Sequence, residues 1–202
     1  MNIMMTKSQK KANKPVQKQK LVLIGNGMAG VRTIEEVIKA DPDLFDITIF
    51  GAEPHGNYNR IMLSPVLAGE KTLNEIMLND DDWYAENNIT LYKGKTVTKI
   101  DRVKRQVITE DGTTAEFDRL LIATGSDPFI LPISGADLPG VVTFRDIRDV
   151  NQMLEASKKH HKAVVIGGGL LGLEAAKGLA TQGMKVTVVH LMDTLMERQL
   201  DE

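Results

Sequence analysis

The chain has 202 residues, a formal net charge of −2 and 42% hydrophobic residues, which predicts a cytoplasmic globular chain with room for one or two domains. No apolar run approaches the length of a membrane span, so we do not expect a membrane protein. Cysteine is absent, which excludes a disulfide, a thiolate nucleophile, a cysteinyl zinc site and an iron–sulfur cluster within this stretch.

Residues 1–20 form a basic arm. They contain no acidic residue and carry a local charge of +6, which leaves −8 for the rest of the chain; the lysines are Lys7, Lys10, Lys11, Lys14, Lys18 and Lys20. Such an arm could bind nucleic acid or an anionic surface. With almost nothing to bury, it is better explained as a disordered, solvated extension, and we do not expect nucleic-acid binding.

A first glycine motif follows residues 21–24, a continuous apolar run typical of a strand buried on both faces of a parallel sheet. The motif opens a predicted helix over residues 31–38. Its first glycine permits a tight turn, the second lets the backbone approach a pyrophosphate, and the third lets helix and strand pack closely. The helix start adds unpaired N–H groups for phosphate oxygens. The predicted cofactor-binding residues are Gly25, Gly27, Met28, Ala29 and Gly30.

An acidic residue follows the next predicted strand, residues 45–50. Glu53 lies roughly 20 positions beyond the glycines, where a dinucleotide site needs a carboxylate for the ribose hydroxyls. Alone it would be an exposed turn glutamate; beside the glycines, the ribose role is favoured.

The middle of the chain predicts a short helix and several strands. Residues 83–87 end the helix, with Asn79 or Asp80 as its cap. Residues 89–92, 96–100 and 105–109 are three short strands of one β-rich insertion, with a hairpin turn at residues 110–113. Residues 120–122 form another buried strand, whose small end residues leave room for a ligand over the sheet edge. Those residues are Ala123, Thr124 and Gly125.

A second glycine motif follows a helix at residues 147–157 and a buried strand at residues 163–166. It opens a helix over residues 170–183, which places Leu171, Ala175, Leu179 and Gly183 at helical spacing and uses Gly178 for close packing. A strand over residues 184–189 comes next. The predicted cofactor-binding residues of this motif are Gly167, Gly169, Leu170, Leu171 and Gly172.

Three histidines near the second motif could bind a cofactor or a metal. His190 ends the last strand and could contact a ribose or a phosphate, or be an ordinary loop histidine, so the choice between NADH and NADPH stays open. The pair His160-His161 has no carboxylate or cysteine at ligand spacing, and we expect no metal site.

Two glycine motifs in one chain predict an α/β, Rossmann-like fold that holds two dinucleotides, FAD and NAD(P)H, for hydride transfer without a catalytic side chain.

Residues 57–72, 82–87 and 196–201 resemble the ferredoxin-reductase-like flavoproteins, and in particular the nitrite reductase large-subunit family. The resemblance implies that Arg60 lies against FAD, that Val97 of a β-meander touches the adenine, and that residues 123–125 pack against FAD. It implies that Glu174 steers the nicotinamide, although a first-turn glutamate favoured by the helix dipole explains it equally well. Tyr58 is interpreted as a core aromatic. Pro65 stands where relatives have a lysine near the flavin.

The resemblance also implies an FAD-binding domain over residues 21–140 and a partial NAD(P)-binding domain over residues 141–202. The chain would be the electron-entry part of a nitrite reductase, passing electrons to an iron–sulfur cluster and sirohaem bound beyond Glu202, in a downstream domain or with a small subunit. Without the segment that returns to the FAD domain, we expect weak FAD retention. A partial NAD(P)-binding domain leaves a sheet edge and an apolar helix face without partners, so we also expect association into homo-oligomers. The alternatives are a ferredoxin or rubredoxin reductase-like flavoprotein and a non-catalytic nucleotide-binding fragment.

Overall fold

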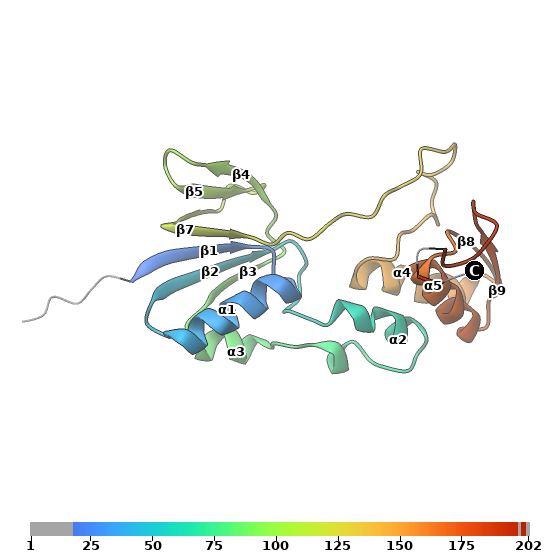
Figure 1. Ribbon diagram of the computed structural model, residues 1–202, viewed down its shortest axis with the longest axis horizontal. Coiled ribbons are helices and arrows are strands. Elements are labelled where there is room, and N and C mark those ends of the chain that lie inside the picture. Colours follow the sequence, from blue (N-terminus) through green and yellow to red (C-terminus); the bar gives the residue numbers. More distant parts are fainter. Residues whose placement is uncertain (1–17, 198, 201–202) are drawn as a thin grey trace, which may run out of the picture.

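The computed structural model describes residues 18–197 and 199–200. Most of the predicted basic arm lies outside the described residues, apart from its last three positions. Figure 1 shows two lobes, which the chain links through the segment around α2 and through a long connection between β7 and α4. In the described part of the chain, no helix is long and apolar enough to cross a membrane.

The first lobe is built on a parallel sheet with strand order β3-β2-β1-β7. Its strands are β1 (Gln19–Ile24), β2 (Phe45–Gly51), β3 (Thr90–Lys93) and β7 (Arg119–Ile122). Helices α1 (Met28–Ala40) and α3 (Asp81–Glu86) lie on one side of this sheet in Figure 1. The Asp80 side chain caps α3 by accepting the Trp83 N–H, which confirms one of the two predicted caps.

The second layer of this lobe is an antiparallel meander of β4 (Val97–Asp101), β5 (Gln106–Thr109) and β6 (Thr114–Glu116). The two faces of the main sheet therefore bury different side chains, because successive residues of a strand point to opposite sides. Leu21 and Leu23 pack with α1 and α3, while Val22 and Ile24 pack with Val107 of the meander.

One strand was assigned to the wrong layer. Residues 89–92 were predicted as part of the β-rich insertion, but β3 pairs in parallel with β2, with Thr48 opposite Thr90. The physical reason is that α3 precedes this strand and carries the chain across, so that it returns in the direction of the main sheet.

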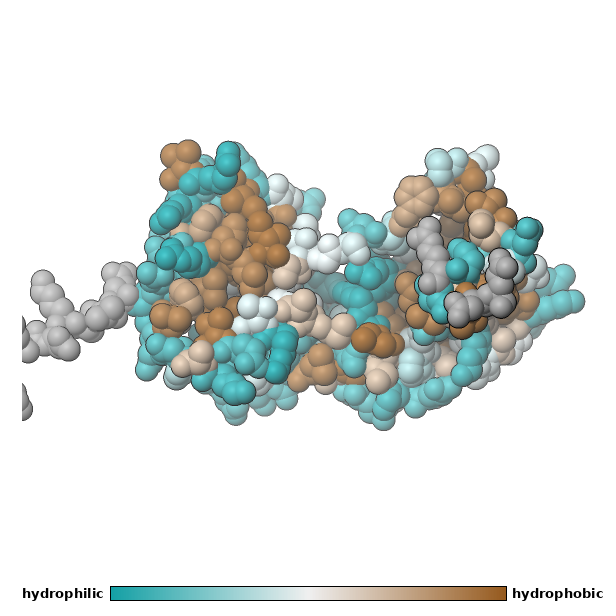
Figure 2. Space-filling model, in the orientation of Figure 1, coloured by the Kyte–Doolittle hydropathy of each residue, from teal (hydrophilic) through white to brown (hydrophobic). Residues whose placement is uncertain are grey.

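The second lobe contains α4 (Ile147–Lys159), β8 (Lys162–Ile166), α5 (Leu170–Thr181) and β9 (Lys185–Val189), with β8 and β9 paired in parallel. The prediction that residues 163–166 are a buried strand is wrong: Val164 is 65% exposed, because the described residues cover only one face of β8. The prediction for residues 120–122 is wrong at their end, where Ile122 is 58% exposed; Leu120 and Leu121 pack into the clusters on the two faces of the main sheet. Figure 2 accordingly shows hydrophobic side chains at the surface of both lobes.

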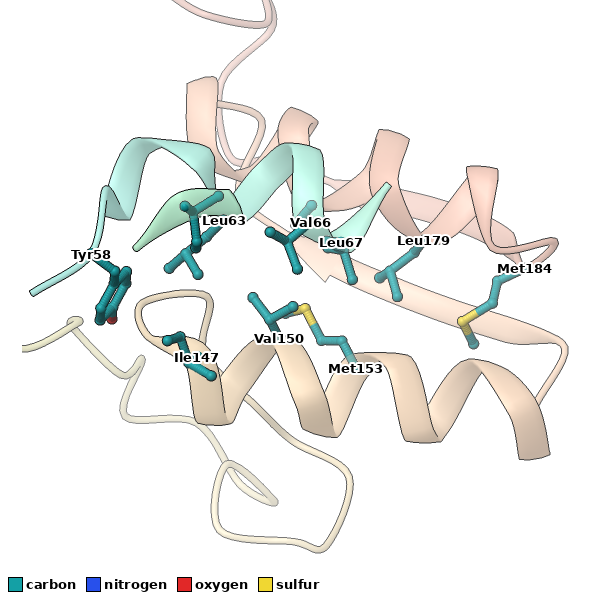
Figure 3. Packing of buried hydrophobic residues seen from close by; sticks show 11 residues of the cluster. Tyr58, Leu63, Val66, Leu67, Ile147, Val150, Met153, Leu179 and Met184 are labelled. Carbon is teal, nitrogen blue, oxygen red and sulfur yellow. The ribbon is translucent and has the colours of Figure 1, made fainter. Parts of the chain in front are cut away.

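A short helix lies between the two lobes. Helix α2 (Leu63–Leu67), preceded by the 3-10 helix η1 (Arg60–Met62) and followed by η2 (Asn74–Ile76), packs against α4 and α5 rather than against the main sheet. Figure 3 shows the result, in which Val66 and Leu67 face Val150, Met153 and Leu179 in one core. The predicted division at residue 140 stays a prediction, but the second core includes residues 58–76.

Helix α5 confirms one packing prediction and corrects another. A Cβ added at Gly178 would lie 2.7 Å from Leu67 Cγ, so the glycine does mark close packing. Ala175 and Leu179 are buried on the same face. Leu171 shares this spacing but is 56% exposed, because the described residues cover the later turns of α5 and leave its first turn open.

Candidate functional site: two glycine turns

The first glycine turn has the geometry that its three glycines predict. Gly25 has φ +105°, which side chains rarely adopt, and its N–H donates to the Phe50 carbonyl over 2.8 Å. A Cβ at Gly25 would overlap the Ala123 carbonyl oxygen, and one at Gly30 would lie 2.9 Å from the Gly25 oxygen. At Gly27, by contrast, a Cβ would meet nothing within 4 Å. The backbone is therefore packed at the first and third glycines and open at the second.

The open glycine is also the N-cap of α1. No side chain caps this helix, and the first described intrahelical bond there runs from the Val31 N–H to the Gly27 carbonyl. The N–H groups of the first turn, which include those of Met28 and Ala29, remain available at the positive end of the helix dipole. An open backbone and free donors fit the pyrophosphate of a dinucleotide.

The carboxyl end of β7 lies beside this turn. The Ala123 N–H donates to the Ile24 carbonyl over 2.8 Å, which fixes residues 123–125 next to Gly25. Gly125 has φ +77°, and a Cβ there would lie 3.6 Å from an Arg145 nitrogen. The structure thus brings Ala123, Thr124 and Gly125 to the sheet edge that the first turn occupies.

Glu53 and Arg60 form one cluster with Tyr58. Arg60 Nη2 lies 2.6 Å from Glu53 Oε1, and the Tyr58 hydroxyl donates to Glu53 Oε2 over 2.7 Å. Arg60 Cζ also lies 5.1 Å from the Tyr58 ring centroid, within the range of a cation–π contact. Burial, and then the Glu53 hydrogen bond, raise the pKa of Tyr58.

This cluster reaches the second lobe. Arg60 Nη1 donates to the Arg145 carbonyl over 2.5 Å, just before α4. Tyr58 is 5% exposed and packs in the second core, which confirms its interpretation as a core aromatic. Val97, the first residue of β4 in the meander, is half-buried and packs against the cluster between the meander and the main sheet.

The second glycine turn repeats the positive φ, the open second glycine and the packed third glycine of the first turn, but a Cβ at its first glycine would meet nothing within 4 Å. Gly167 has φ +116° and its N–H donates to the Val189 carbonyl over 2.8 Å. A Cβ at Gly172 would overlap the Gly167 carbonyl oxygen, whereas one at Gly169 would meet nothing within 4 Å. Gly169 is the N-cap of α5, again without a side-chain cap. The N–H groups of Leu170 and Leu171 are thus available in the same way as those of the first turn.

The side chain of His190, which follows β9, contacts the second glycine turn. Its Nδ1 accepts the Gly168 N–H over 3.0 Å, and its Nε2 lies 3.2 Å from Glu197 Oε2. The Gly168 amide is therefore engaged by a side chain, and the donors open to a phosphate are those of the first turn of α5.

Glu174 lies in the second turn of α5, and the first turn contains no acidic residue, so the interpretation as a first-turn glutamate is wrong. The helix begins at Leu170, one full turn before this carboxylate. The Ser64 hydroxyl of α2 donates to Glu174 Oε2 over 2.5 Å. The residue after the second glycine turn is thus tied to the helix that follows Arg60.

The sequence analysis missed a set of polar residues beneath the first turn. Tyr84, Asn57 and Asn79 link the side chain of Asn26, which lies within the glycine motif, to Glu35 of α1. Ser64 was missed as well. The only available signal was the density of asparagines around residue 57, which a surface turn explains equally well.

These features agree with a match to known proteins. Residues 19–202 match the model of the family described as pyridine nucleotide-disulphide oxidoreductase. The chain belongs to this family. The fold is accordingly the FAD- and NAD(P)-binding fold of these oxidoreductases, and membership implies FAD and NAD(P)H as cofactors. Because the sequence has no cysteine, the redox disulfide in the family's name cannot lie in these residues.

Two similar proteins belong to nitrite or nitrate reductase systems. The chain is 61% identical over 184 residues to "Nitrite reductase [NAD(P)H]" of Bacillus subtilis and 54% identical over 187 residues to the "Assimilatory nitrate reductase electron transfer subunit" of the same organism. It covers 23% and 24% of those proteins, and they match 91% and 93% of this chain. Among solved structures, NADH:rubredoxin oxidoreductase from Clostridium acetobutylicum superposes with a TM-score of 0.81 at 28% identity, over 92% of this chain and 48% of that one.

Proposed function

We propose that this chain is the electron-entry part of an NAD(P)H-dependent nitrite reductase, with FAD at the first glycine turn and NAD(P)H at the second. The observation that carries the proposal is the geometry that the two turns share: a first glycine at positive φ, an open second glycine at an uncapped helix N-terminus, and a packed third glycine. Strong identity to a nitrite reductase supports the choice of system.

The first site would hold FAD through the backbone around Gly27, with the small residues Ala123, Thr124 and Gly125 at its edge and Val97 toward the adenine. Glu53 would serve the ribose, and Arg60 would supply positive charge next to it. When bound, FAD supplies the ability to accept a hydride from the nicotinamide and to release electrons one at a time.

The second site would hold NAD(P)H through the first turn of α5, with His190 at the adenosine end and Glu174 toward the nicotinamide. Glu174 is held in place by Ser64 of α2, the helix that follows Arg60. A residue of the second site is therefore oriented by a segment next to the first site. The chain's contribution is therefore binding, orientation and charge, and no side-chain nucleophile or general base is needed.

The rest of the proposed system is carried over from the resemblance to the nitrite reductase large-subunit family. The acceptor would be an iron–sulfur cluster and sirohaem in a downstream domain or a small subunit, in a cytoplasmic enzyme. The resemblance to ferredoxin reductases, including a benzene dioxygenase system reductase at 34% identity, favours a ferredoxin-reducing flavoprotein as the second candidate. Four cysteines at cluster spacing in the gene after Glu202 would favour the nitrite reductase.

The test uses one substitution in each open glycine position. Gly27→Ala should weaken FAD binding by about tenfold or more, because a methyl group would stand where the pyrophosphate approaches the backbone, and should leave NADH binding unchanged. Gly169→Ala should do the reverse. Each variant is the control for the other, and both should keep the fold because neither methyl group meets a neighbour.

Fluorescence titrations of the 202-residue chain with FAD and with NADH measure both affinities. Anaerobic addition of NADH to the FAD-loaded chain should remove the visible flavin absorption. A wild-type chain that binds neither dinucleotide, or two variants that bind both as tightly as the wild type does, would refute the proposal.

A further inference from the structure

We infer that the hydroxyl group of Tyr84 is a positioning group that fixes the first glycine turn relative to the loop that carries Arg60. This inference concerns how the proposed FAD site is held in shape, and it rests on that proposal for its meaning. The observation behind it is the hydrogen-bonded network under the turn, to which none of the predicted cofactor-binding residues belongs.

The Tyr84 hydroxyl uses both of its hydrogen-bonding capacities on these two segments. It donates its proton to Asn26 Oδ1 over 2.9 Å, and its oxygen accepts the Asn57 N–H over 3.1 Å. A phenol has one proton, so this arrangement sets the direction of both bonds. Asn26 stands between the first two glycines, and Asn57 stands three residues before Arg60. One oxygen atom therefore bridges the turn and the loop.

On the side of the turn, Asn26 is held from two further directions. Its Nδ2 lies 3.4 Å from the His55 carbonyl oxygen, at the long end of a hydrogen bond. A Cβ at Gly51, the last residue of β2, would lie 2.9 Å from Asn26 Cβ, so the side chain sits tightly over the strand end. With this side chain turned into the protein, the backbone of the turn is left to face a ligand.

On the side of the loop, Asn57 is 2% exposed, and both its backbone N–H and its carbonyl make hydrogen bonds. Its carbonyl accepts the Leu78 N–H over 2.8 Å, and its Nδ2 donates to Asn79 Oδ1 over 2.9 Å. Asn79 Nδ2 lies 3.3 Å from Glu35 Oε1 of α1. The network thus returns to the helix that the glycine turn begins, which makes it a closed support rather than a single contact.

Two further observations favour a positioning role. Tyr84 is 3% exposed in a core of apolar residues, and burial raises its pKa, so the hydroxyl keeps its proton and remains a donor. Asn57 Oδ1 is buried and has no hydrogen-bond partner among the described residues. An unpaired buried acceptor costs stability, and an apolar residue would avoid that cost unless the remaining bonds of the asparagine were needed for geometry.

The test compares Tyr84→Phe with Tyr92→Phe in the full 202-residue chain. Both remove one hydroxyl from the first lobe and keep a ring; Tyr92 stacks on Phe50, with centroids 4.8 Å apart, and its hydroxyl makes no hydrogen bond to the described residues. Tyr84→Phe removes two hydrogen bonds, and part of their free energy should be lost from FAD binding. We therefore expect FAD affinity to fall by about tenfold in this variant. Tyr92→Phe should bind FAD as the wild type does.

Backbone amide shifts in the protein without ligands provide a readout that does not depend on FAD. In Tyr84→Phe the amides of Gly25 and Gly27 should move, while that of Gly167 should not, and NADH affinity should stay unchanged. A merely structural role would instead lower stability and weaken FAD and NADH binding together. In an Asn26→Ala background, Tyr84→Phe should lose most of its effect on the Gly25 and Gly27 amides.

The possible outcomes separate this inference from the proposed function. Unmoved glycine amides in Tyr84→Phe overturn the inference, whether or not FAD binds. Moved amides with unchanged FAD affinity also overturn it, because the turn would then tolerate displacement. If Tyr84→Phe moves the Gly25 and Gly27 amides but the wild-type chain binds no FAD, the positioning role of Tyr84 is supported and the proposed FAD site is rejected.

Discussion

The contact between Leu67 of α2 and Gly178 of α5 makes a quantitative prediction about how α2 is held on the second lobe. Leu67 is fully buried, and its truncation to alanine should destabilise the chain by about 3 kcal/mol, within the range of about 2–5 kcal/mol for buried leucines. A Cβ at Gly178 would lie 2.7 Å from Leu67 Cγ and 2.9 Å from Leu67 Cδ2, so the wild-type side chain leaves no room for a methyl group.

Gly178→Ala has two opposing effects. Overpacking against Leu67 should cost about 2 kcal/mol, and the better helix propensity of alanine should return about 1 kcal/mol, for a net loss of about 1 kcal/mol. In the Leu67→Ala background the contacts with Cγ and Cδ2 are gone, and the contact with the Cβ of residue 67, at 3.2 Å, needs a shift of only a few tenths of an ångström, so the propensity gain dominates. The same substitution should then stabilise by about 1 kcal/mol, which gives a coupling energy of about 2 kcal/mol.

Urea unfolding of the wild type, both single variants and the double variant, followed by circular dichroism, measures this cycle. Leu63→Ala is the control, because Leu63 is buried in the same helix and cluster but is not among the nearest neighbours of Gly178. Its cycle with Gly178→Ala should be additive. Additivity in the Leu67 cycle as well would mean that α2 does not pack on α5 in solution, and the reasoning would fail.

Two further predictions concern polar contacts. Ser64→Ala should lower the free energy of unfolding by about 1.5 kcal/mol, because the charged Glu174 carboxylate loses a hydrogen bond, and Ser64→Thr should restore most of it; equal stability of all three proteins in urea would contradict this. Burial raises the pKa of Tyr58 and of Tyr84. Because the folded values exceed the unfolded value of about 10, the contribution of these two tyrosines to stability should be constant below that pH and fall as the pH rises above it. Tyr84→Phe should flatten part of this alkaline decline, and an unchanged slope would count against the assignment.

The sequence alone determined the local features of the fold. The spacing of Gly25, Gly27 and Gly30 was enough to predict which glycine is turned, which is open and which is packed, and the same holds for the second motif. The reason is that a positive φ, an uncapped helix start and a close helix–strand approach are all set within a few residues. The Asp80 cap and the packing role of Gly178 were predictable on the same grounds.

Only the tertiary structure decided which segments share a core and which polar groups meet. Ser64 and Glu174 are 110 positions apart, and Asn26 and Tyr84 are 58 positions apart; no periodicity relates such pairs. The burial of Ile122 and Val164 was misjudged for a related reason: an apolar run shows that a strand can be buried on two faces, but only the packing of other elements covers a face. Long-range packing therefore placed α2 on the second lobe and Tyr84 beneath the first turn.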